Sequence, residues 1–264
     1  MKPATPSNDV KSCCANLYQS EFACLLLGDS FHPGGLRLTA RLGEWLGLGP
    51  GMRVLDVACG KGESAILLAQ RFGCEVVGID FGAENIREAE ARAVSASVAH
   101  LAAFHQGDAE RIEFLDSTFD TVICECAFCT FPDKSAAAGE FARALKPGGK
   151  VGLSDLTLSG TLPAELNGLL AWVACIADAR PISEYASYLT GAGLHDFEVE
   201  LHDEALAEMV KDIRGKLLGV ELMSKLKKLN LEGVNFAEAK TLARAAADAV
   251  RGGTLGYALI VTQR

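Results

Sequence analysis

The stretch "VLDVACGKGE", residues 54–63, decides the fold of this chain. Its apolar first half indicates a buried strand, and Glu63 begins a helical pattern. Between them, Gly60 and Gly62 let the backbone approach a ligand closely, and the free N–H groups at the helix start attract polar atoms. The stretch therefore predicts a strand–turn–helix unit with a ligand site at its turn. It lacks the third glycine of the dinucleotide fingerprint, since residue 65 is alanine.

On either side of this stretch, short apolar segments alternate with helical patterns, which is typical of a parallel α/β sheet. The expected strands are 53–58, 74–80, 102–108, 119–125, 150–156, 197–202 and 255–263. The expected helices are 63–72, 83–99, 134–146, 162–178 and 181–193, with a helical insertion over about 204–251. The pattern predicts a doubly wound, Rossmann-like sheet of seven strands. Its last strand is expected to be antiparallel, with a helical cap over the carboxyl ends of the strands.

Composition and charge limit the classes of partner. The chain has 264 residues, 49% of them hydrophobic, and a formal net charge of −9. An acidic protein of this kind is not expected to bind nucleic acid or an anionic membrane. Residues 1–15 contain no apolar secretory segment, so we expect a cytoplasmic, reducing location. In that compartment the nine cysteines are more typical of thiols, ligands or catalytic groups than of disulfides.

A carboxylate marks each of the first three predicted strands near its carboxyl end. Asp56 precedes the glycine turn, and Asp80 ends the second strand, where a carboxylate can bind both hydroxyls of a ribose. Asp108 follows the third strand, where it can accept a hydrogen bond from an adenine amine. The three positions together predict a nucleoside ligand.

The segments "VLDVACGKGE", "GID", "GDAE" and "LKPGG", in this order, resemble the class I S-adenosylmethionine-dependent methyltransferases over about residues 50–156. The resemblance implies that Asp80 holds the ribose, that Asp108 and Ala109 read the adenine, and that the glycine loop cradles the methionine part. Ala58 stands where that family often has its first glycine. The full set of expected cofactor-binding residues is Asp56, Ala58, Gly60, Gly62, Asp80, Phe81, Asp108, Ala109, Glu125 and Gly35.

The same resemblance suggests three regions. Residues 1–50 are expected to form an N-terminal helical cap segment, and residues 51–203 the S-adenosylmethionine-binding α/β core. Residues 204–264 are expected to supply the helical insertion and the final antiparallel strand of the same sheet. The loop around His32 and Gly35 then either closes over the cofactor or is a simple turn at a helix start.

Cysteine is the distinctive chemistry of this sequence. The stretch "VICECAFCTF", residues 122–131, holds Cys124, Cys126 and Cys129 at the end of the fourth predicted strand. Methyltransferases of amides and amines carry an N-P-P-Y type sequence there, and "CECAF" argues against such acceptors. Thiolates instead favour a soft acceptor. The side chain of Cys124 is expected to point into the sheet packing.

The spacing of the cysteines resembles that of arsenite methyltransferases. Cys175 follows Cys126 by 49 positions, in "CIADARPISEY", and a Cys-Cys pair precedes the first strand. The resemblance implies trivalent arsenic as acceptor, a small-molecule substrate, and a thiol reductant as a further partner. The expected catalytic residues are Cys126, Cys175 and Cys14; further substrate-binding candidates are Cys13, Cys24 and Cys129, and no protein-bound metal is expected.

Several alternatives stay open from the sequence alone. A small thiol, sulfide or selenide could be the acceptor, or the chain could bind a metal or metalloid without turnover. Cys126 and Cys129 could also form a redox pair or contribute to a structural zinc site. Phe128, Phe131 and Trp172 could contact the cofactor's sulfonium or simply pack in the core.

Overall fold

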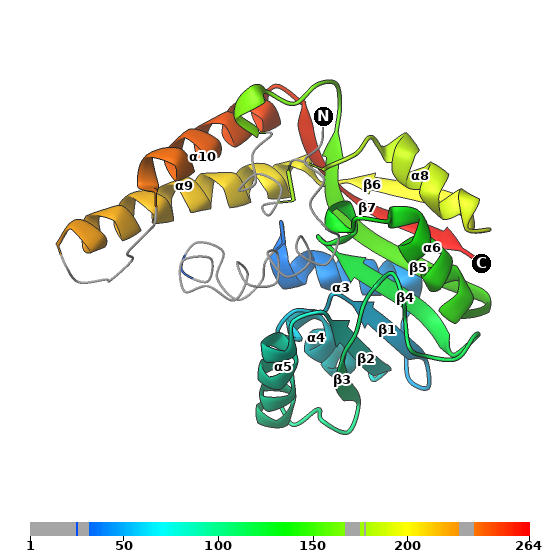
Figure 1. The fold of residues 1–264 in the computed structure, drawn as a ribbon. Coiled ribbons are helices and arrows are strands. Elements are labelled where there is room, and N and C mark those ends of the chain that lie inside the picture. The colour runs from blue at the N-terminus through cyan, green and yellow to red at the C-terminus, as the bar shows by residue number, and fades with distance from the viewer. Residues whose placement is uncertain (1–24, 26–31, 167–174, 177, 227–234) are drawn as a thin grey trace.

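The computed structural model describes residues 25, 32–166, 175–176, 178–226 and 235–264. Its centre is one seven-stranded sheet in the order β3-β2-β1-β4-β5-β7-β6, drawn in Figure 1. Strands β1 to β5 pair in parallel, and β7 runs antiparallel to both of its neighbours. The predicted fold class, a doubly wound sheet with an antiparallel last strand, is confirmed.

The strands are β1 (Arg53–Val57), β2 (Glu75–Asp80), β3 (Ala102–Gln106), β4 (Phe119–Glu125), β5 (Leu145–Leu158), β6 (His195–Leu201) and β7 (Leu255–Gln263). The α-helices are α3 (Gly35–Leu46), α4 (Glu63–Phe72), α5 (Ala83–Ser95), α6 (Lys134–Ala144), α8 (Ile182–Gly191), α9 (Asp203–Lys225) and α10 (Phe236–Arg251). Two short 3-10 turns, η1 (Phe128–Thr130) and η2 (Ala164–Leu166), follow β4 and β5.

Two apolar layers cover the faces of the sheet. Helices α3, α4 and α5 pack on one face, where Leu42, Leu68 and Ala89 are buried against the strands. Helices α6 and α8 belong to the layer that buries Phe141 and Tyr185. Strands covered on both faces carry near-continuous apolar runs, which explains why β1, β4 and β7 are so rich in Val, Ile and Leu. The sheet is therefore a rigid base for groups at its carboxyl edge.

Two expected elements differ in the structure. The fifth strand begins at Leu145 rather than at residue 150, with an irregular register opposite residues 119–121 of β4. The helix expected over 162–178 is not continuous, because 164–166 form a 3-10 turn and Cys175 lies in a turn with a φ of 63°. A left-handed residue ends helical geometry, so Cys175 cannot lie inside a helix.

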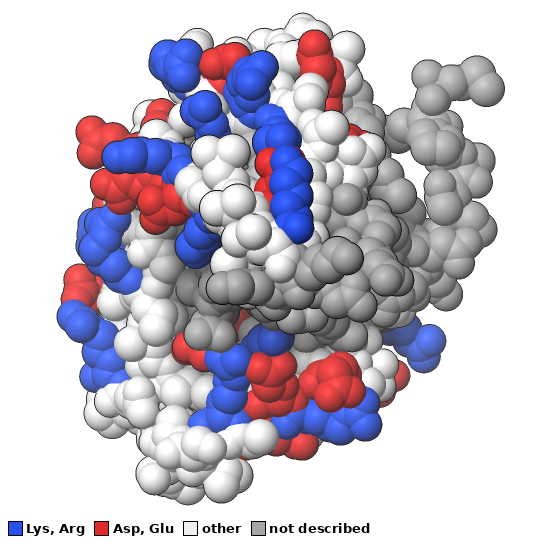
Figure 2. Space-filling view, turned by 90° about the vertical axis from the view of Figure 1, so that its left-hand side faces the viewer, with Lys and Arg blue, Asp and Glu red and all other residues white. Residues whose placement is uncertain are grey.

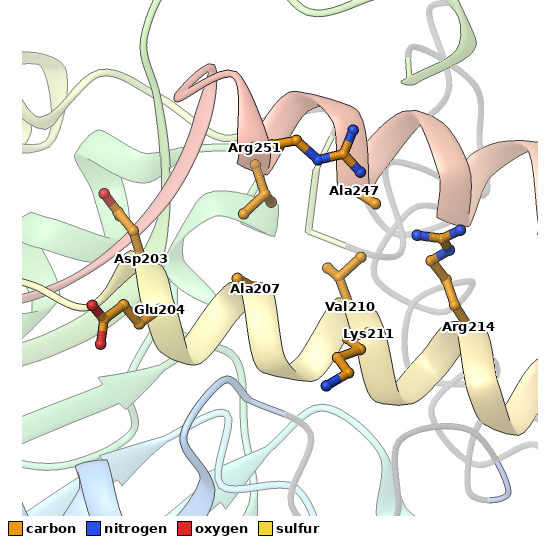
Figure 3. Close-up of a pocket in the computed structure, with 9 residues that line it drawn as sticks. Asp203, Glu204, Ala207, Val210, Lys211, Arg214, Ala247 and Arg251 are labelled. Atoms are coloured by element: carbon orange, nitrogen blue, oxygen red, sulfur yellow. The ribbon is translucent and has the colours of Figure 1, made fainter.

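Helices α9 and α10 form an antiparallel pair that projects from the sheet in Figure 1. The start of α9 is tied to β7, because the Asp203 carboxylate accepts the backbone N–H of Tyr257 at 2.9 Å. A groove of about 380 Å³ runs between the two helices and is lined by residues of both charges, among them Glu204, Lys211 and Arg214 (Figure 3). Charges of both signs are likewise interspersed on the face shown in Figure 2.

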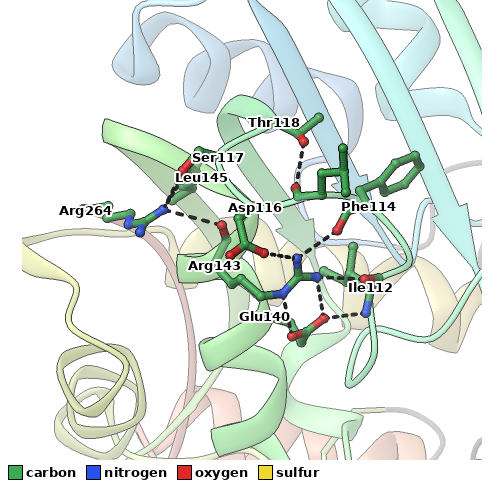
Figure 4. Close-up of polar contacts among 10 residues, drawn as sticks. Ile112, Phe114, Asp116, Ser117, Thr118, Glu140, Arg143, Leu145 and Arg264 are labelled. Atoms are coloured by element: carbon green, nitrogen blue, oxygen red, sulfur yellow. Dashed lines mark hydrogen bonds and ion pairs between the residues drawn. The ribbon is translucent and has the colours of Figure 1, made fainter.

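A polar network fastens the segment that enters β4. The Arg143 guanidinium donates to the carbonyls of Ile112 and Phe114 and to the carboxylates of Asp116 and Glu140 (Figure 4). Glu140 in turn accepts the backbone N–H of Ile112 at 2.7 Å. Helix α6 is thus bound to the chain just beyond the predicted adenine-binding residues.

The described helices include none with both the length and the apolar character needed to cross a membrane.

Candidate active site

The turn between β1 and α4 is built for a close approach to a ligand. Ala58, Gly60 and Gly62 all have a left-handed φ, of 59°, 53° and 79°. A Cβ on Gly62 would lie 2.8 Å from the Phe104 ring, so this position requires glycine. Among the residues that the structure describes, a Cβ on Gly60 would meet nothing within 4 Å. The described part of the chain therefore leaves room for a ligand at Gly60.

Asp80, at the end of β2, is buried and held from three sides. Its carboxylate accepts the N–H groups of Gly60 (2.9 Å) and Gly82 (2.8 Å) and the side-chain amide of Asn85 (3.0 Å). Burial raises the pKa of this carboxyl above its usual value, while these hydrogen bonds oppose the rise. The next residue, Phe81, accepts a hydrogen bond from Gln106 through its carbonyl. The carboxylate that was predicted to bind ribose thus lies directly against the glycine turn.

Asp56 carries an unsatisfied buried oxygen. The residue is 2% exposed, and its Oδ2 atom has no hydrogen-bond partner among the described residues. Burial raises the pKa of this carboxyl well above its usual value, and the nearby charges of Glu125 and Asp80 raise it further. A buried acceptor without a donor is costly, which makes Asp56 a place for a donor or a cation from a ligand.

The predicted adenine-binding residues lie in a tight turn after β3. The Asp108 side chain accepts the backbone N–H of Glu110 at 3.0 Å, and Ala109 packs partly buried against the core. The network around Arg143 holds the chain three residues further on. The Asp108 side chain therefore fixes the turn itself, and Arg143 of α6 fixes the chain that follows it.

Glu125 forms the centre of a buried cluster of hydroxyl groups. Its carboxylate accepts from Thr39 of α3 at 3.0 Å and from Ser64 of α4 at 2.5 Å. His32 lies within reach, with its Nε2 atom 3.8 Å from the same carboxylate. The predicted residues Glu125, Gly35 and His32 are brought together, because the Gly35 N–H bonds the His32 carbonyl at 3.2 Å at the start of α3.

Three cysteines meet beyond the carboxyl end of β4. Cys126 follows Glu125, and its N–H donates to the Ser154 carbonyl of β5 at 2.6 Å. The Cys175 thiol donates to the Cys126 carbonyl at 3.1 Å and is in hydrogen-bond contact with the thiols of both Cys126 and Cys129. Residues from two segments 49 positions apart therefore form one thiol cluster, which we define as Cys126, Cys129 and Cys175.

Two of the three thiols of this cluster, those of Cys126 and Cys129, are held in their protonated form. The hydrogen bond to Cys175 and then burial raise the pKa of Cys126 well above its usual value. For Cys129, burial is the larger cause of a similarly raised pKa, followed by the hydrogen bond to Cys175. The thiols of Cys126 and Cys129 are therefore neutral at rest.

Asp155, on β5, lies beside the thiol cluster, and the sequence patterns did not predict it as a site residue. Its carboxylate accepts the N–H of Cys129 and the N–H of Leu156, both at 2.8 Å. The side chain is 1% exposed, and burial, followed by the charge of Cys175, raises its pKa to about 7. A carboxylate after an apolar strand segment, "GLSDL", was the signal that could have drawn attention to it.

The other cysteines lie elsewhere. Cys124 is fully buried in the core of the sheet, and Cys59 and Cys74 are buried on the opposite face. Cys13, Cys14 and Cys24 lie outside the described residues, as does Trp172. Phe128 and Phe131 are buried and make an edge-on ring contact, so the core-packing alternative describes them. Within the described ranges, no three His, Cys, Asp or Glu side chains form a ready-made site for a metal ion.

Comparison with known proteins decides the family. A family model described as a methyltransferase domain matches residues 48–192, which is more than half of the chain. The chain belongs to the methyltransferase domain family. The match spans the glycine turn, the three strand-end carboxylates and the thiol cluster.

Related proteins agree with this assignment. The chain is 29% identical over 174 residues to the methyltransferase GfsG of Streptomyces halstedii, covering 65% of this chain and 63% of that protein. It is 32% identical over 180 residues to phosphoethanolamine N-methyltransferase 1 of Arabidopsis thaliana, covering 68% of this chain and 32% of that protein. The chain thus spans between about a third and two thirds of the length of these relatives.

The fold also matches solved structures. Phosphoethanolamine N-methyltransferase 2 of Haemonchus contortus, in complex with S-adenosyl-L-methionine, superposes with a TM-score of 0.80 at 19% identity, over all of this chain and 61% of that one. At this identity the superposition shows a shared fold. The residues of this chain fit S-adenosylmethionine. Among the described residues nothing lies within 4 Å of a Cβ on Gly60, the Oδ2 atom of Asp56 has no partner, and Asp80 lies against the glycine turn.

Proposed function

We propose that this methyltransferase methylates trivalent arsenic held by the thiol cluster of Cys126, Cys129 and Cys175. One observation carries the proposal: the Cys175 thiol contacts the thiols of Cys126 and Cys129 next to Glu125, at the sheet edge that also carries the glycine turn. Three thiols suit a soft, pyramidal centre better than an oxygen-bound one. The resemblance predicted Cys14 as third ligand, and the contact with Cys175 supports Cys129 instead.

The protonated state of the Cys126 and Cys129 thiols suits neutral arsenous acid. Each thiol forms an arsenic–sulfur bond and its proton leaves with an arsenic-bound hydroxyl group as water, so three thiols release three waters without net change of charge. A raised thiol pKa therefore does not prevent binding. We propose that Cys13 and Cys14 act in reduction or delivery together with a thiol reductant, with Cys24 as a further candidate.

When bound, the cofactor would supply an electrophilic methyl group that the arsenic lone pair can take without a general base, with S-adenosylhomocysteine as the leaving group. The arsenic is thereby oxidised by two electrons, and the thiol reductant named above would return it to the trivalent state. The chain's part is binding and orientation. We propose that Asp80 holds the ribose hydroxyls, that the turn of Asp108 and Ala109 holds the adenine, and that the glycine turn with Asp56 receives the methionine part. Ala58, Phe81, Glu125 and Gly35 are proposed to shape this site from the surrounding backbone and the hydroxyl cluster.

Backbone strain supports a role for two of the cysteines. Cys126 and Cys175 both have a left-handed φ, of 52° and 63°. Residues other than glycine and asparagine rarely adopt this backbone conformation. Glycine at either position would avoid the strain. Strain of this kind gathers at functional sites, and here it is found at both thiols that the resemblance implied.

The charge of the site argues against a phosphorylated acceptor such as that of the phosphoethanolamine enzymes. Asp56, Asp80, Glu125 and Asp155 are buried at the same edge, and none of them makes an ion pair with a lysine or arginine of the described ranges. An anionic phosphate would find no paired cation among these carboxyl groups, and each of them that is ionised would repel it in a region of low dielectric. A neutral soft acceptor meets no such repulsion.

A panel of acceptors tests the proposal. Purified protein is incubated with S-adenosylmethionine and, separately, arsenite with a thiol reductant, sulfide, methanethiol, selenite or phosphoethanolamine, and S-adenosylhomocysteine is measured. Arsenite is expected to give the highest turnover, and Cys129→Ser and Cys175→Ser are each expected to abolish it. Cys74→Ser, which changes a buried cysteine on the other face of the sheet, is the matched control and should retain turnover.

The alternatives give different results in the same panel. Turnover of sulfide, methanethiol or selenite without turnover of arsenite would support the small thiol or selenide reading. Binding of arsenite with no S-adenosylhomocysteine would support a binding protein. Either result contradicts the arsenite proposal.

A further inference from the structure

Lys134 is a lysine whose side chain is almost completely buried. Its side chain is 5% exposed, and its Nζ atom donates to the carbonyl of Phe131 at 3.0 Å and to the Asp178 carboxylate at 2.6 Å. The Asp178 side chain is 8% exposed. Burying both members of an ion pair removes water from two charges, and the attraction between them repays this only when the geometry is good.

The position of Lys134 in its helix adds to that cost. Lys134 is the first residue of α6, and the N-terminus of a helix carries partial positive charge that repels a cation. A neutral residue there would avoid both penalties. Since packing alone does not require a charge at this position, the contacts that the amine makes should explain its presence.

Those contacts join the two segments that carry the thiol cluster. Phe131 is the residue after η1, which contains Cys129, and Ala127 alone separates η1 from Cys126. Asp178 lies three residues beyond Cys175, and the N–H of Ala179 bonds the carbonyl of Ile176 at 3.2 Å, which keeps this short segment turned. Through its two hydrogen bonds, the Lys134 amine thus links the Cys126–Cys129 loop to the Cys175 turn.

We propose that Lys134 is a positioning residue that holds the Cys175 thiol against the thiols of Cys126 and Cys129. The inference rests on the proposed function for its substrate, and on the two bonds of the amine for its geometry. Asp155 fixes the Cys129 backbone from the side of β5, so the loop has an anchor that does not depend on Lys134. Lys134 adds a second link from that loop to the Cys175 side, beside the bond from the Cys175 thiol to the Cys126 carbonyl.

The variant Lys134→Met removes the amine and keeps a long apolar side chain. Asp178 does not become an unpaired buried charge, because Arg180 also donates to its carboxylate. A misplacement of about 1 Å in a reacting group can lower a rate by about a hundredfold. We therefore expect Lys134→Met to raise the KM for arsenite at least about tenfold and to change the KM for S-adenosylmethionine less than about twofold.

Lys146→Met is the matched control. Lys146 pairs with Asp120 at 2.8 Å, at the opposite end of α6 and β4 from the cysteines. This control should leave both KM values unchanged. If Lys134 had a purely structural role, Lys134→Met would have a lower melting temperature but the same two KM values as the wild type. That result would overturn the proposal.

A second measurement does not depend on arsenite. The oxidant diamide is added to the reduced protein, and disulfides between Cys175 and Cys126 or Cys129 are followed over time by peptide mass spectrometry. Lys134→Met should form them at least about fivefold more slowly, because the thiols are no longer held together. Asp178→Asn weakens the same bond from the other side and should slow disulfide formation in the same way.

The two outcomes are separable. If the wild type fails to methylate arsenite and Lys134→Met still slows disulfide formation, the proposed function fails and the positioning role stands. If disulfide formation proceeds at the wild-type rate in Lys134→Met, the positioning role fails whatever the acceptor.

Discussion

At the scale of single residues, Ala58 in the glycine turn has a backbone conformation that is unfavourable for alanine. Ala58 has a φ of 59°, a conformation that is about 1 kcal/mol or more easier for glycine. We expect Ala58→Gly to leave the free energy of unfolding in urea unchanged or to raise it by up to about 1 kcal/mol. Ala91→Gly, on the exposed face of α5, should instead lower it by about 1 kcal/mol. Equal losses in both variants would contradict the strain at Ala58.

The strain at Cys126 allows stability and chemistry to be separated. Cys126→Gly removes the thiol and the left-handed strain, whereas Cys126→Ala removes the thiol and keeps the strain. Both variants should lose arsenite methylation, and the glycine variant should be more stable by about 1 kcal/mol in urea unfolding. A glycine variant that is less stable than the alanine variant, or that keeps full activity, would show that this reading of Cys126 is wrong.

A site residue can be predicted from the sequence when its neighbours in the chain determine its position. It cannot be predicted when its position depends on contacts with residues far away in the chain. Asp80, Gly60 and Gly62 are predictable because they lie on strands and turns whose order along the chain defines the sheet edge. Cys129 could not be assigned, because its contact with Cys175 depends on a turn 46 positions away. Lys134 gave no signal, since a lysine at a helix start normally lies on the surface and its burial appears only after folding.

At the scale of elements, the network of Arg143 couples helix α6 to the turn that carries the predicted adenine-binding residues. Arg143→Met removes charge-assisted bonds to Glu140 and Asp116 and to two backbone carbonyls. We expect it to lower the free energy of unfolding by about 2 kcal/mol. The KM for S-adenosylmethionine should rise, and the KM for arsenite should not.

Lys146→Met also serves as the control for this prediction. Its partly exposed ion pair with Asp120 should contribute less than about 1 kcal/mol. An Arg143→Met protein whose stability and KM for S-adenosylmethionine match the wild type would show that the network does not hold the turn.

The elements themselves were predicted well where the pattern was local. Strands with runs of Val, Ile and Leu and helix α4 appear where the sequence places them, because each carries its own periodicity. The helix expected through Cys175 was wrong at its end. The left-handed turn there bonds Cys126, just after β4, and lies next to Asp178, which bonds Lys134 at the start of α6. Local propensity gives way to tertiary contacts where the site is formed.

At the scale of the whole molecule, the buried carboxylates make stability depend on pH. The folded-state pKa of Asp155 is about 7, above the usual value of an aspartate. The folded form therefore holds this proton more tightly than the unfolded form. Its contribution to stability is fully present below about pH 4 and is lost as the pH rises through about 7.

Asp155→Asn tests this dependence, because asparagine does not titrate. Between about pH 5 and pH 8, the free energy of unfolding of the wild type should fall relative to that of Asp155→Asn. Urea unfolding of both proteins at a series of pH values measures the difference. A difference that stays constant with pH, or that moves in favour of the wild type as the pH rises, would contradict a raised pKa of Asp155.

The central claim is that three thiols of this chain hold trivalent arsenic beside the cofactor turn. Arsenic K-edge X-ray absorption measures it most directly, by the number of sulfur neighbours of arsenite bound to the protein. The protein with Cys13, Cys14 and Cys24 changed to serine should show three sulfur neighbours, and the further change Cys129→Ser should leave two. A spectrum with oxygen neighbours only, or a sulfur count that Cys129→Ser does not change, would contradict the account.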